Sequence, residues 1–229
     1  SALDQCDNYP HIIYSSSFKE LESDDPYADS KKQSREMISR WCTLNQCTFT
    51  GLIIPNVFGP FCRPNYNSFI ATFCHNIQNG EDPSIIDDNL IELIYVNDLC
   101  KLVIKCIQQK VNNHNLIVES DYKFKVSDVL SKLKEFKTLY SELGFFPDIS
   151  DAFNLKLFNT YRSYIDIEKV FPKIITKHTD SRGFFAELTN SLSPGQFSIS
   201  STKPGITRGN HYHTRKVERF IILSGSARV

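Results

Sequence analysis

The chain has 229 residues, and its 26 Lys and Arg residues balance its 26 Asp and Glu residues, so the formal net charge is zero. Because binding of nucleic acid needs a clustered excess of Lys and Arg, this balance argues against a nucleic-acid partner. No apolar run approaches the ~18 residues of a membrane span. The seven cysteines include no Cys-x-x-C pair, and the first residues show no signal-peptide pattern. We therefore expect a cytoplasmic protein that binds neither membranes nor nucleic acid.

Strand and helix patterns alternate through the first part of the chain. A short apolar run at residues 11–14 leads into three serines, and a helix is expected over residues 27–41 because Asp25 and Pro26 form a start signal. Further strands are expected at 49–55, 90–96 and 116–119, with a helix at 68–78. Two more helices are expected, one capped by Asn97 and Asp98 and running through residue 109, and one capped by Ser127. Such alternation predicts an α/β fold with a mainly parallel sheet covered by helices.

The pattern changes after about residue 171. Short strand-like runs at 173–176, 196–200 and 218–223 are separated by Pro and Gly, with no helical period. This is an all-β pattern, so we expect one domain over residues 1–168 and a second over residues 169–229. Both domains are expected to be partial, since the first lacks an initial strand–helix unit and the second ends inside a strand-like run.

Tyr27 and Lys31 are four residues apart on the expected helix and therefore share one face. A bare Tyr-x-x-x-Lys pattern also fits a solvated helix face, but here a Ser-rich strand end precedes it and a Pro-Asn-Val-Phe-Gly-Pro loop follows the next strand. Reduction of a ketone by hydride leaves an alkoxide that needs a proton donor. A phenol beside an ammonium group can donate that proton, and a Ser hydroxyl can hold the carbonyl oxygen.

Together these residues resemble the extended short-chain dehydrogenase/reductases. The resemblance implies a doubly wound, Rossmann-type sheet, of which this chain holds the C-terminal part. It implies that Tyr27 is the general acid/base, and that Lys31 favours the phenolate and binds the nicotinamide ribose. Ser17, with Ser16 as the alternative, would orient the substrate carbonyl. Pro55 and Asn56 would lie near the nicotinamide of NADP or NAD, and Asn56 also near the sugar, although a loop-capping amide is the other interpretation of Asn56.

The Gly-rich turn that holds the dinucleotide pyrophosphate in this family is absent, because no spacing among the nine glycines fits it. The chain is therefore expected to lack the first strands of the domain. It is also expected to bind a dinucleotide poorly by itself.

A second pattern, Gly-x5-His-x-His-x4-Glu-x6-Gly, covers residues 205–225. His211 and His213 would share one face of a strand, and a turn could bring Glu218 beside them. Two imidazoles and a carboxylate suit zinc, and also another divalent metal such as Fe(II). Two exposed loop histidines beside a glutamate are the plain alternative.

This pattern resembles the first motif of the cupins, whose second motif, with the remaining His ligand, is not in the chain. Upstream, the segment around Arg182 resembles the start of the deoxysugar epimerase cupins, in which Arg182 would fit a diphosphate. The non-metal epimerases of that group carry a catalytic His that falls on His211, but His213 and Glu218 complete a metal spacing, so we favour His211 as a ligand.

A reductase followed by a metal-type cupin resembles the bifunctional enzymes of UDP-N-acetyl-L-fucosamine and UDP-N-acetyl-L-rhamnosamine biosynthesis. The resemblance implies C3 epimerisation of a UDP-4-keto-6-deoxy-amino sugar by the cupin, then NAD(P)H-dependent reduction of its C4 ketone, in a homo-oligomer. Arg63, Asn65 and Asn67 would contact the UDP-sugar, although a polar loop explains them equally. Two other interpretations are a metal-cupin oxygenase fused to an unrelated α/β domain, and an inactive nucleotide-sugar-binding fragment.

Overall fold

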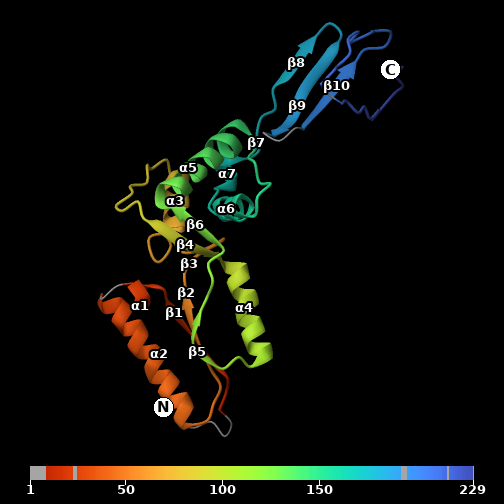
Figure 1. Ribbon diagram of the computed structural model, residues 1–229. Helices are drawn as coiled ribbons and strands as arrows, with labels where there is room; N and C mark the ends of the chain where they lie inside the picture. The colour runs from red at the N-terminus through yellow and green to blue at the C-terminus, as the bar shows by residue number, and fades with distance from the viewer. Residues whose placement is uncertain (1–8, 23–24, 192–194, 216, 229) are drawn as a thin grey trace. The chain divides into compact units, whose positions relative to one another are not determined.

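The structure is a computed structural model that describes residues 9–22, 25–191, 195–215 and 217–228. The chain divides into two compact units. Unit 1 comprises Ser1–Lys173 and Asn190–Gly195, and unit 2 comprises Ile174–Thr189 and Gln196–Val229. Each is described by itself (Figure 1).

Unit 1 contains two three-stranded sheets and the helices that cover them. The strands are β1 (Ile12–Ser17), β2 (Phe49–Ile54), β3 (Asn56–Phe58), β4 (Leu90–Tyr95), β5 (Asn113–Ile117), β6 (Tyr122–Lys125) and the short β7 (Phe145–Phe146). The helices are α1 (Lys19–Glu22), α2 (Pro26–Leu44), α3 (Phe69–Gln78), α4 (Val96–Gln109), α5 (Val126–Phe136), α6 (Ala152–Arg162) and α7 (Ile167–Val170), with a π-helix at Lys137–Leu143.

The first sheet has the order β1-β2-β5, and all its pairs are parallel. Every residue of β2 is buried, as expected for a central strand of a parallel sheet that is covered on both faces. Helix α2 packs on one face of this sheet. On the other face Leu52 and Ile54 form a buried cluster with residues of α4 (Figure 1). The parallel α/β arrangement predicted from the sequence is thus confirmed.

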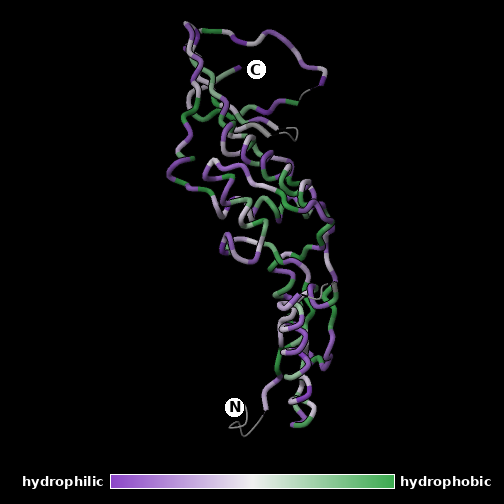
Figure 2. The backbone as a smooth tube through the Cα atoms, turned by 90° about the vertical axis from the view of Figure 1, so that its left-hand side faces the viewer, coloured by the Kyte–Doolittle hydropathy of each residue, from purple (hydrophilic) through white to green (hydrophobic). Residues whose placement is uncertain are grey.

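The second sheet has the order β3-β4-β6, with β3 and β4 parallel and β4 and β6 antiparallel. The largest core of unit 1 lies between this sheet and helices α3, α5 and α6, and its fully buried side chains include Phe58, Leu93, Leu133, Leu157 and Tyr161. Hydrophobic and hydrophilic residues alternate along the helices, as expected when one helix face is buried (Figure 2).

Two helix starts differ from the sequence-based expectation. Helix α4 begins at Val96 without a side-chain cap, and Asp98 lies in its first turn, where it pairs with Lys101 and Lys156. Helix α5 begins at Val126, so Ser127 is not its cap but bonds to Asp88. The expected start of α2 is confirmed, because the Asp25 carboxylate accepts the Ala28 N–H at 2.8 Å and Pro26 follows it.

Unit 2 is built around an antiparallel pair, β8 (Lys177–Asp180) with β9 (Gly183–Ser191), and β10 (Gln196–Thr202) lies along the other edge of β9. The last two residues of β9, which belong to unit 1, pair with β7. The expected strand at 173–176 is wrong, because β8 begins at Lys177. The expected strand at 218–223 is also wrong, since no strand is formed in the described residues after Thr202, so a complete cupin barrel is not seen.

No helix in the described ranges is both long enough and apolar enough to cross a membrane.

Candidate active site

The carboxyl ends of β1 and β2 lie side by side and bring together residues that are distant in the sequence. Ser17 is paired in register with Ile54, and the Phe18 N–H donates to the Ile54 carbonyl at 3.0 Å. Pro55 and Asn56 follow Ile54 directly, with Pro55 buried and Asn56 exposed. Carboxyl ends of parallel strands are where α/β folds bind ligands. Ser17, Pro55 and Asn56 therefore share the edge at which a ligand site is expected.

Tyr27 lies in the first turns of α2 and keeps 51% of its surface exposed. The Lys31 ammonium is 5.8 Å from the centre of the Tyr27 ring, and it is equally close to the ring of Tyr14 on β1. Lys19 of α1 brings a second ammonium within 5.7 Å of the Tyr27 ring. The phenol thus has two cationic neighbours, of which the sequence pattern indicated only Lys31.

The three serines at the end of β1 have different surroundings. Ser16 is buried, and its hydroxyl donates to the Glu20 carboxylate at 2.5 Å. Ser17 is half-buried, and its hydroxyl oxygen accepts the Lys19 N–H at 3.3 Å. Because the Ser16 hydroxyl is already used by a buried carboxylate, Ser17 is the better candidate to hold a substrate oxygen.

The expected substrate residues Arg63, Asn65 and Asn67 are exposed on the loop between β3 and α3. The Arg63 guanidinium lies 5.6 Å from the ring centre of Tyr66, and the Asn65 N–H donates to the Thr72 hydroxyl at 2.9 Å with φ of 55°. A guanidinium beside an aromatic face suits a nucleotide diphosphate.

This loop is fixed to the end of α6. The Phe61 N–H donates to the Ser163 hydroxyl at 3.1 Å, and the Tyr164 hydroxyl donates to the Cys62 carbonyl at 2.5 Å. Burial raises the pKa of Tyr164, so it remains a neutral donor at physiological pH. Two hydrogen bonds therefore hold the loop to the end of α6, which reduces the entropy lost when a ligand orders it.

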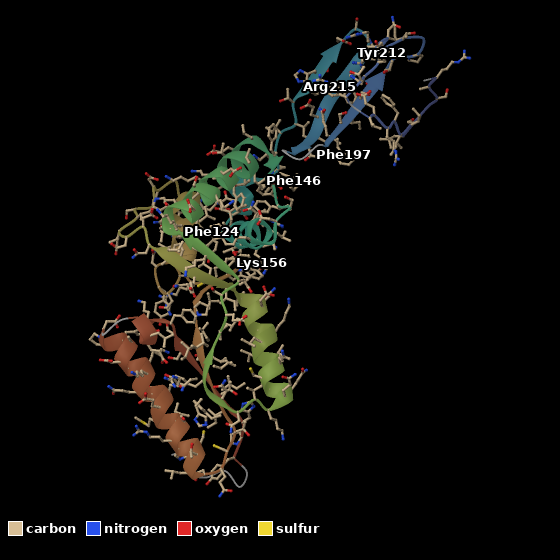
Figure 3. All side chains as sticks on the ribbon, viewed as in Figure 1. Phe124, Phe146, Lys156, Phe197, Tyr212 and Arg215 are labelled. Carbon is tan, nitrogen blue, oxygen red and sulfur yellow. The ribbon has the colours of Figure 1, made fainter. Side chains whose placement is uncertain are left out.

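The sequence reasoning missed a polar cluster around Lys156 of α6 (Figure 3). The Lys156 ammonium pairs with Asp98 at 2.6 Å, bonds to the Tyr122 hydroxyl at 2.8 Å and lies 4.9 Å from the Tyr122 ring centre. Hydrogen bonds from Lys156 and Lys101 hold the pKa of Asp98 below its usual range. No sequence spacing links these residues, because they come from three separate elements, α4, β6 and α6.

In unit 2, Arg182 lies in the turn between β8 and β9. Its guanidinium donates to Asp180 at 2.6 and 3.0 Å, and its backbone N–H donates to the same carboxylate at 2.8 Å. These bonds lower the pKa of Asp180 to about 2. A diphosphate would therefore have to compete with Asp180 for the Arg182 guanidinium.

His211, His213 and Glu218 lie next to one another, although on irregular chain and not on a strand as expected. The Nε2 atoms of His211 and His213 are 3.2 Å apart, and the Nε2 atom of His213 is 3.2 Å from a Glu218 oxygen. Within the described ranges, no group of three or more His, Cys, Asp or Glu side chains is arranged to hold a metal ion. The contacts thus link the three side chains pairwise.

Arg208, for which the sequence patterns predict no role, connects the segment that carries His211 and His213 to strands β9 and β10. Its guanidinium donates to the carbonyls of Phe184 and Ser201 at 3.3 and 3.0 Å. The labelled side chains Phe197 and Tyr212 are largely exposed in the same unit (Figure 3).

Comparison with known protein families gives two matches. Residues 7–118 match the NAD dependent epimerase/dehydratase family, and residues 178–229 match the Polysaccharide biosynthesis C-terminal domain. The first part of the chain is similar in sequence to this epimerase/dehydratase family. The match includes Ser17, Tyr27, Lys31, Pro55 and Asn56, whereas the second match includes Arg182 and the histidine segment.

Among curated relatives, the chain is 34% identical over 219 residues to UDP-2-acetamido-2,6-beta-L-arabino-hexul-4-ose reductase of Pseudomonas aeruginosa, covering 95% of this chain and 58% of that protein. The spore coat polysaccharide biosynthesis protein SpsL of Bacillus subtilis is 40% identical over 68 residues, covering 28% of this chain and 45% of that protein.

Among solved structures, the capsular polysaccharide assembling protein CapF of Staphylococcus aureus has a TM-score of 0.80 and 31% identity, covering 92% of this chain and 58% of that chain. A UDP-N-acetylglucosamine 4-epimerase of Methanobrevibacter ruminantium, at 20% identity and a TM-score of 0.57 over 68% of this chain and 63% of that chain, shows the shared Rossmann-like fold. The chain spans less than two thirds of the length of these reductase, CapF and epimerase chains.

Proposed function

We propose that the protein reduces the C4 ketone of a UDP-4-keto-6-deoxy-amino sugar with NADPH or NADH, in the synthesis of a polysaccharide precursor. The observation that carries this proposal is the meeting of Ser17, Pro55 and Asn56 at one sheet edge, with the Tyr27–Lys31 pair on the helix that covers it. Similarity to a UDP-hexulose reductase over 95% of the chain supports the substrate class.

A bound reduced nicotinamide would supply the hydride that C4 of the sugar needs, and the carbonyl oxygen would take up a proton. Tyr27 donates that proton and regains one from solvent, while Ser17 holds the oxygen, and the ammonium groups of Lys31 and Lys19 lie 5.8 and 5.7 Å from the centre of the Tyr27 ring. The products are the C4 alcohol and the oxidised nucleotide. Arg63, Asn65 and Asn67 would hold the UDP-sugar, and Asn56 would lie beside it.

The test is NAD(P)H oxidation with a UDP-4-keto-6-deoxy-amino sugar, measured in the natural protein that carries this sequence. Because Tyr27→Phe removes only the phenolic hydroxyl group, which carries the proton, we expect it to lower kcat by at least ~10²-fold, the lower end of what general acid catalysis contributes. Tyr14→Phe is the matched control, since its ring also faces Lys31, and it should reduce the ketone at a near-normal rate. A normal rate in Tyr27→Phe would contradict the proposal.

We further propose that unit 2 binds a divalent metal, zinc in the first instance, through His211, His213 and Glu218, and catalyses C3 epimerisation. In a tetrahedral zinc site with bonds of ~2.0 Å, neighbouring ligand atoms are ~3.3 Å apart. The separations of 3.2 Å between His211 and His213 and between His213 and Glu218 are close to that spacing. A bound metal would polarise the C4 carbonyl and so acidify the C3 hydrogen, and Arg182 would contact the diphosphate if it released Asp180.

Metal binding is tested by titrating the chain with Zn²⁺ in a calorimeter. We expect one Zn²⁺ per chain, and His213→Ala should abolish binding because His213 is the central member of the cluster. His178→Ala is the control, since His178 lies on β8 outside the pattern. Exchange of the C3 hydrogen with solvent should be lost in His213→Ala and kept in Tyr27→Phe. Zn²⁺ binding that survives in His213→Ala would contradict the assignment.

A further inference from the structure

A buried ion pair joins α1 to α2 about one helical turn beyond Lys31, on the side of α2 that carries Tyr27 and Lys31. The Arg35 guanidinium lies 2.8 Å from a Glu20 oxygen, and its Nε atom donates to the same carboxylate at 2.9 Å. The two side chains are 8% and 1% exposed. Arg35 follows Lys31 by one helical turn, and the sequence patterns gave neither Glu20 nor Arg35 a role.

Each partner of the pair makes a second connection. Glu20 also accepts the Ser16 hydroxyl at 2.5 Å, so the carboxylate is bonded to the residue next to Ser17. Arg35 donates to the His114 carbonyl at 3.1 Å and to the Asn115 side chain, both on β5. The ion pair therefore links the strand that ends in Ser17, the helix that carries Tyr27 and the far strand of the sheet.

Gly51 on β2 leaves the space through which Arg35 reaches β5. A Cβ atom at this position would come within 3.0 Å of the Arg35 Cδ atom and 2.4 Å of the His114 carbonyl oxygen. A larger residue at position 51 would thus exclude the arginine from the sheet face. Arg35 can therefore pair with Glu20 and donate to β5 at the same time only because position 51 is a glycine.

Such a pair is costly to bury, because desolvation of two charges offsets much of their attraction, and an apolar pair of similar volume is often equally stable. The ion pair is therefore not expected to add much to the stability of the fold. Its geometry does, however, fix the position of α1 relative to α2. We propose that Glu20 and Arg35 are positioning residues, which hold the end of β1 against α2 so that Ser17 and Tyr27 face the same substrate oxygen. This inference rests on the proposed ketone reduction.

The test compares three variants of the natural protein that carries this sequence. Glu20→Gln removes one charge, the double variant Glu20→Leu with Arg35→Met removes both, and Glu36→Gln is the matched control. Glu20, Arg35 and Glu36 all line a hollow of about 480 Å³. Glu36 follows Arg35 in α2 but takes no part in the ion pair. The measurements are the melting temperature, kcat and KM for ketone reduction, and the ¹³C resonance of the Tyr27 ring, identified by its loss in Tyr27→Phe.

We expect the double variant to melt within a few degrees of the wild type, yet to reduce the ketone with a kcat lower by ~10²-fold, the cost of a misplacement of about 1 Å in a catalytic group. KM should stay within about twofold, since the substrate contacts are elsewhere, and the Tyr27 resonance should move in Glu20→Gln and in the double variant but not in Glu36→Gln. A folded double variant with wild-type kcat and an unmoved Tyr27 resonance would overturn the inference.

The two proposals fail in different ways. A wild-type protein that does not reduce the ketone contradicts the proposed function. The Tyr27 resonance still decides the positioning role in that case, because it needs no turnover. An unmoved resonance in both charge-removing variants overturns the positioning role even if the wild type reduces the ketone.

Discussion

The two candidate sites of the molecule are supported in different ways. In unit 1, Ser17 and Tyr27 lie on a strand and a helix that are joined by a buried ion pair and rest on a buried central strand. In unit 2, His211 and His213 lie on irregular chain, and large apolar side chains nearby, such as Phe220 and Leu223, are exposed. Residues far from the first site can therefore change it through packing, whereas the second site depends on its own side chains.

The difference shows two ways in which side chains are brought together. A short sequence pattern can place them side by side through local chain geometry, and tertiary packing can place side chains from distant elements together. The members of the histidine pattern are brought together by local chain geometry. The ring centres of His211 and His213 are 4.7 Å apart, in an edge-to-face arrangement. The Tyr27–Lys31 pair becomes a candidate site only together with Ser17 and Pro55, which come from other elements, and with the ion pair that joins α2 to Glu20 of α1. The predictions below test this contrast.

The largest effect on stability is expected for a leucine in the core of unit 1. Leu133 of α5 is 0% exposed and belongs to the core that α5 shares with α3 and α6, so Leu133→Ala should lower the free energy of unfolding by ~2–5 kcal/mol. Leu223→Ala in unit 2 is the matched control, because Leu223 is 79% exposed and its loss should change stability by less than ~0.5 kcal/mol. Urea unfolding followed by circular dichroism measures both. Equal losses in the two variants would contradict the contrast.

A smaller effect is expected at the start of the helix that carries Tyr27. Asp25→Ala removes the carboxylate that accepts the Ala28 N–H and should cost ~1 kcal/mol, a typical loss for an N-cap. Asp29→Ala, in the first turn of the same helix, loses only a charge near the helix dipole and should cost ~0.3–1 kcal/mol, less than the loss of the cap. Hydrogen exchange of the first-turn amides of α2 should increase in Asp25→Ala more than in Asp29→Ala. The reverse order would show that the cap is not what fixes this end.

The sequence predicted the elements whose signals are local. Alternation of strands and helices gave the parallel α/β arrangement, and the Asp25–Pro26 signal placed the start of α2 within one residue. It could not predict the Glu20–Arg35 pair or the Lys156 cluster, because these join residues 15 and 58 positions apart through tertiary packing. It was also wrong about a strand at 218–223, where apolar residues gave a β pattern although the described chain provides no partner strand.

The smallest predicted effect concerns the titration of two carboxylates, the more exposed Asp180 in unit 2 and the more buried Asp98 in unit 1. The Asp180 carboxyl in unit 2 should titrate near pH 2, because bonds from Arg182 lower its pKa to about 2. Arg182→Ala should return the midpoint towards the ordinary pKa of an aspartate, ~3.9, whereas Lys177→Ala, on the same strand as Asp180, should not. The measurement is the pH dependence of the Asp180 side-chain ¹³C resonance. A wild-type midpoint near pH 4 would contradict the Asp180–Arg182 pair.

The sign of the stability effect follows from the lowered pKa. A carboxylate whose pKa is lower when folded stabilises the fold above its unfolded value of ~3.9, and this contribution is lost as the pH falls through about 2. The two ion pairs should also differ in their response to salt. Asp180 and Arg182 are 42% and 53% exposed, whereas Asp98 and Lys156 are 26% and 23% exposed. Since ions screen exposed pairs more strongly, raising the salt from ~0.1 to ~1 M should move the Asp180 midpoint upward more than that of Asp98. Equal shifts would mean that the Asp98–Lys156 pair is as open to solvent as the pair in unit 2.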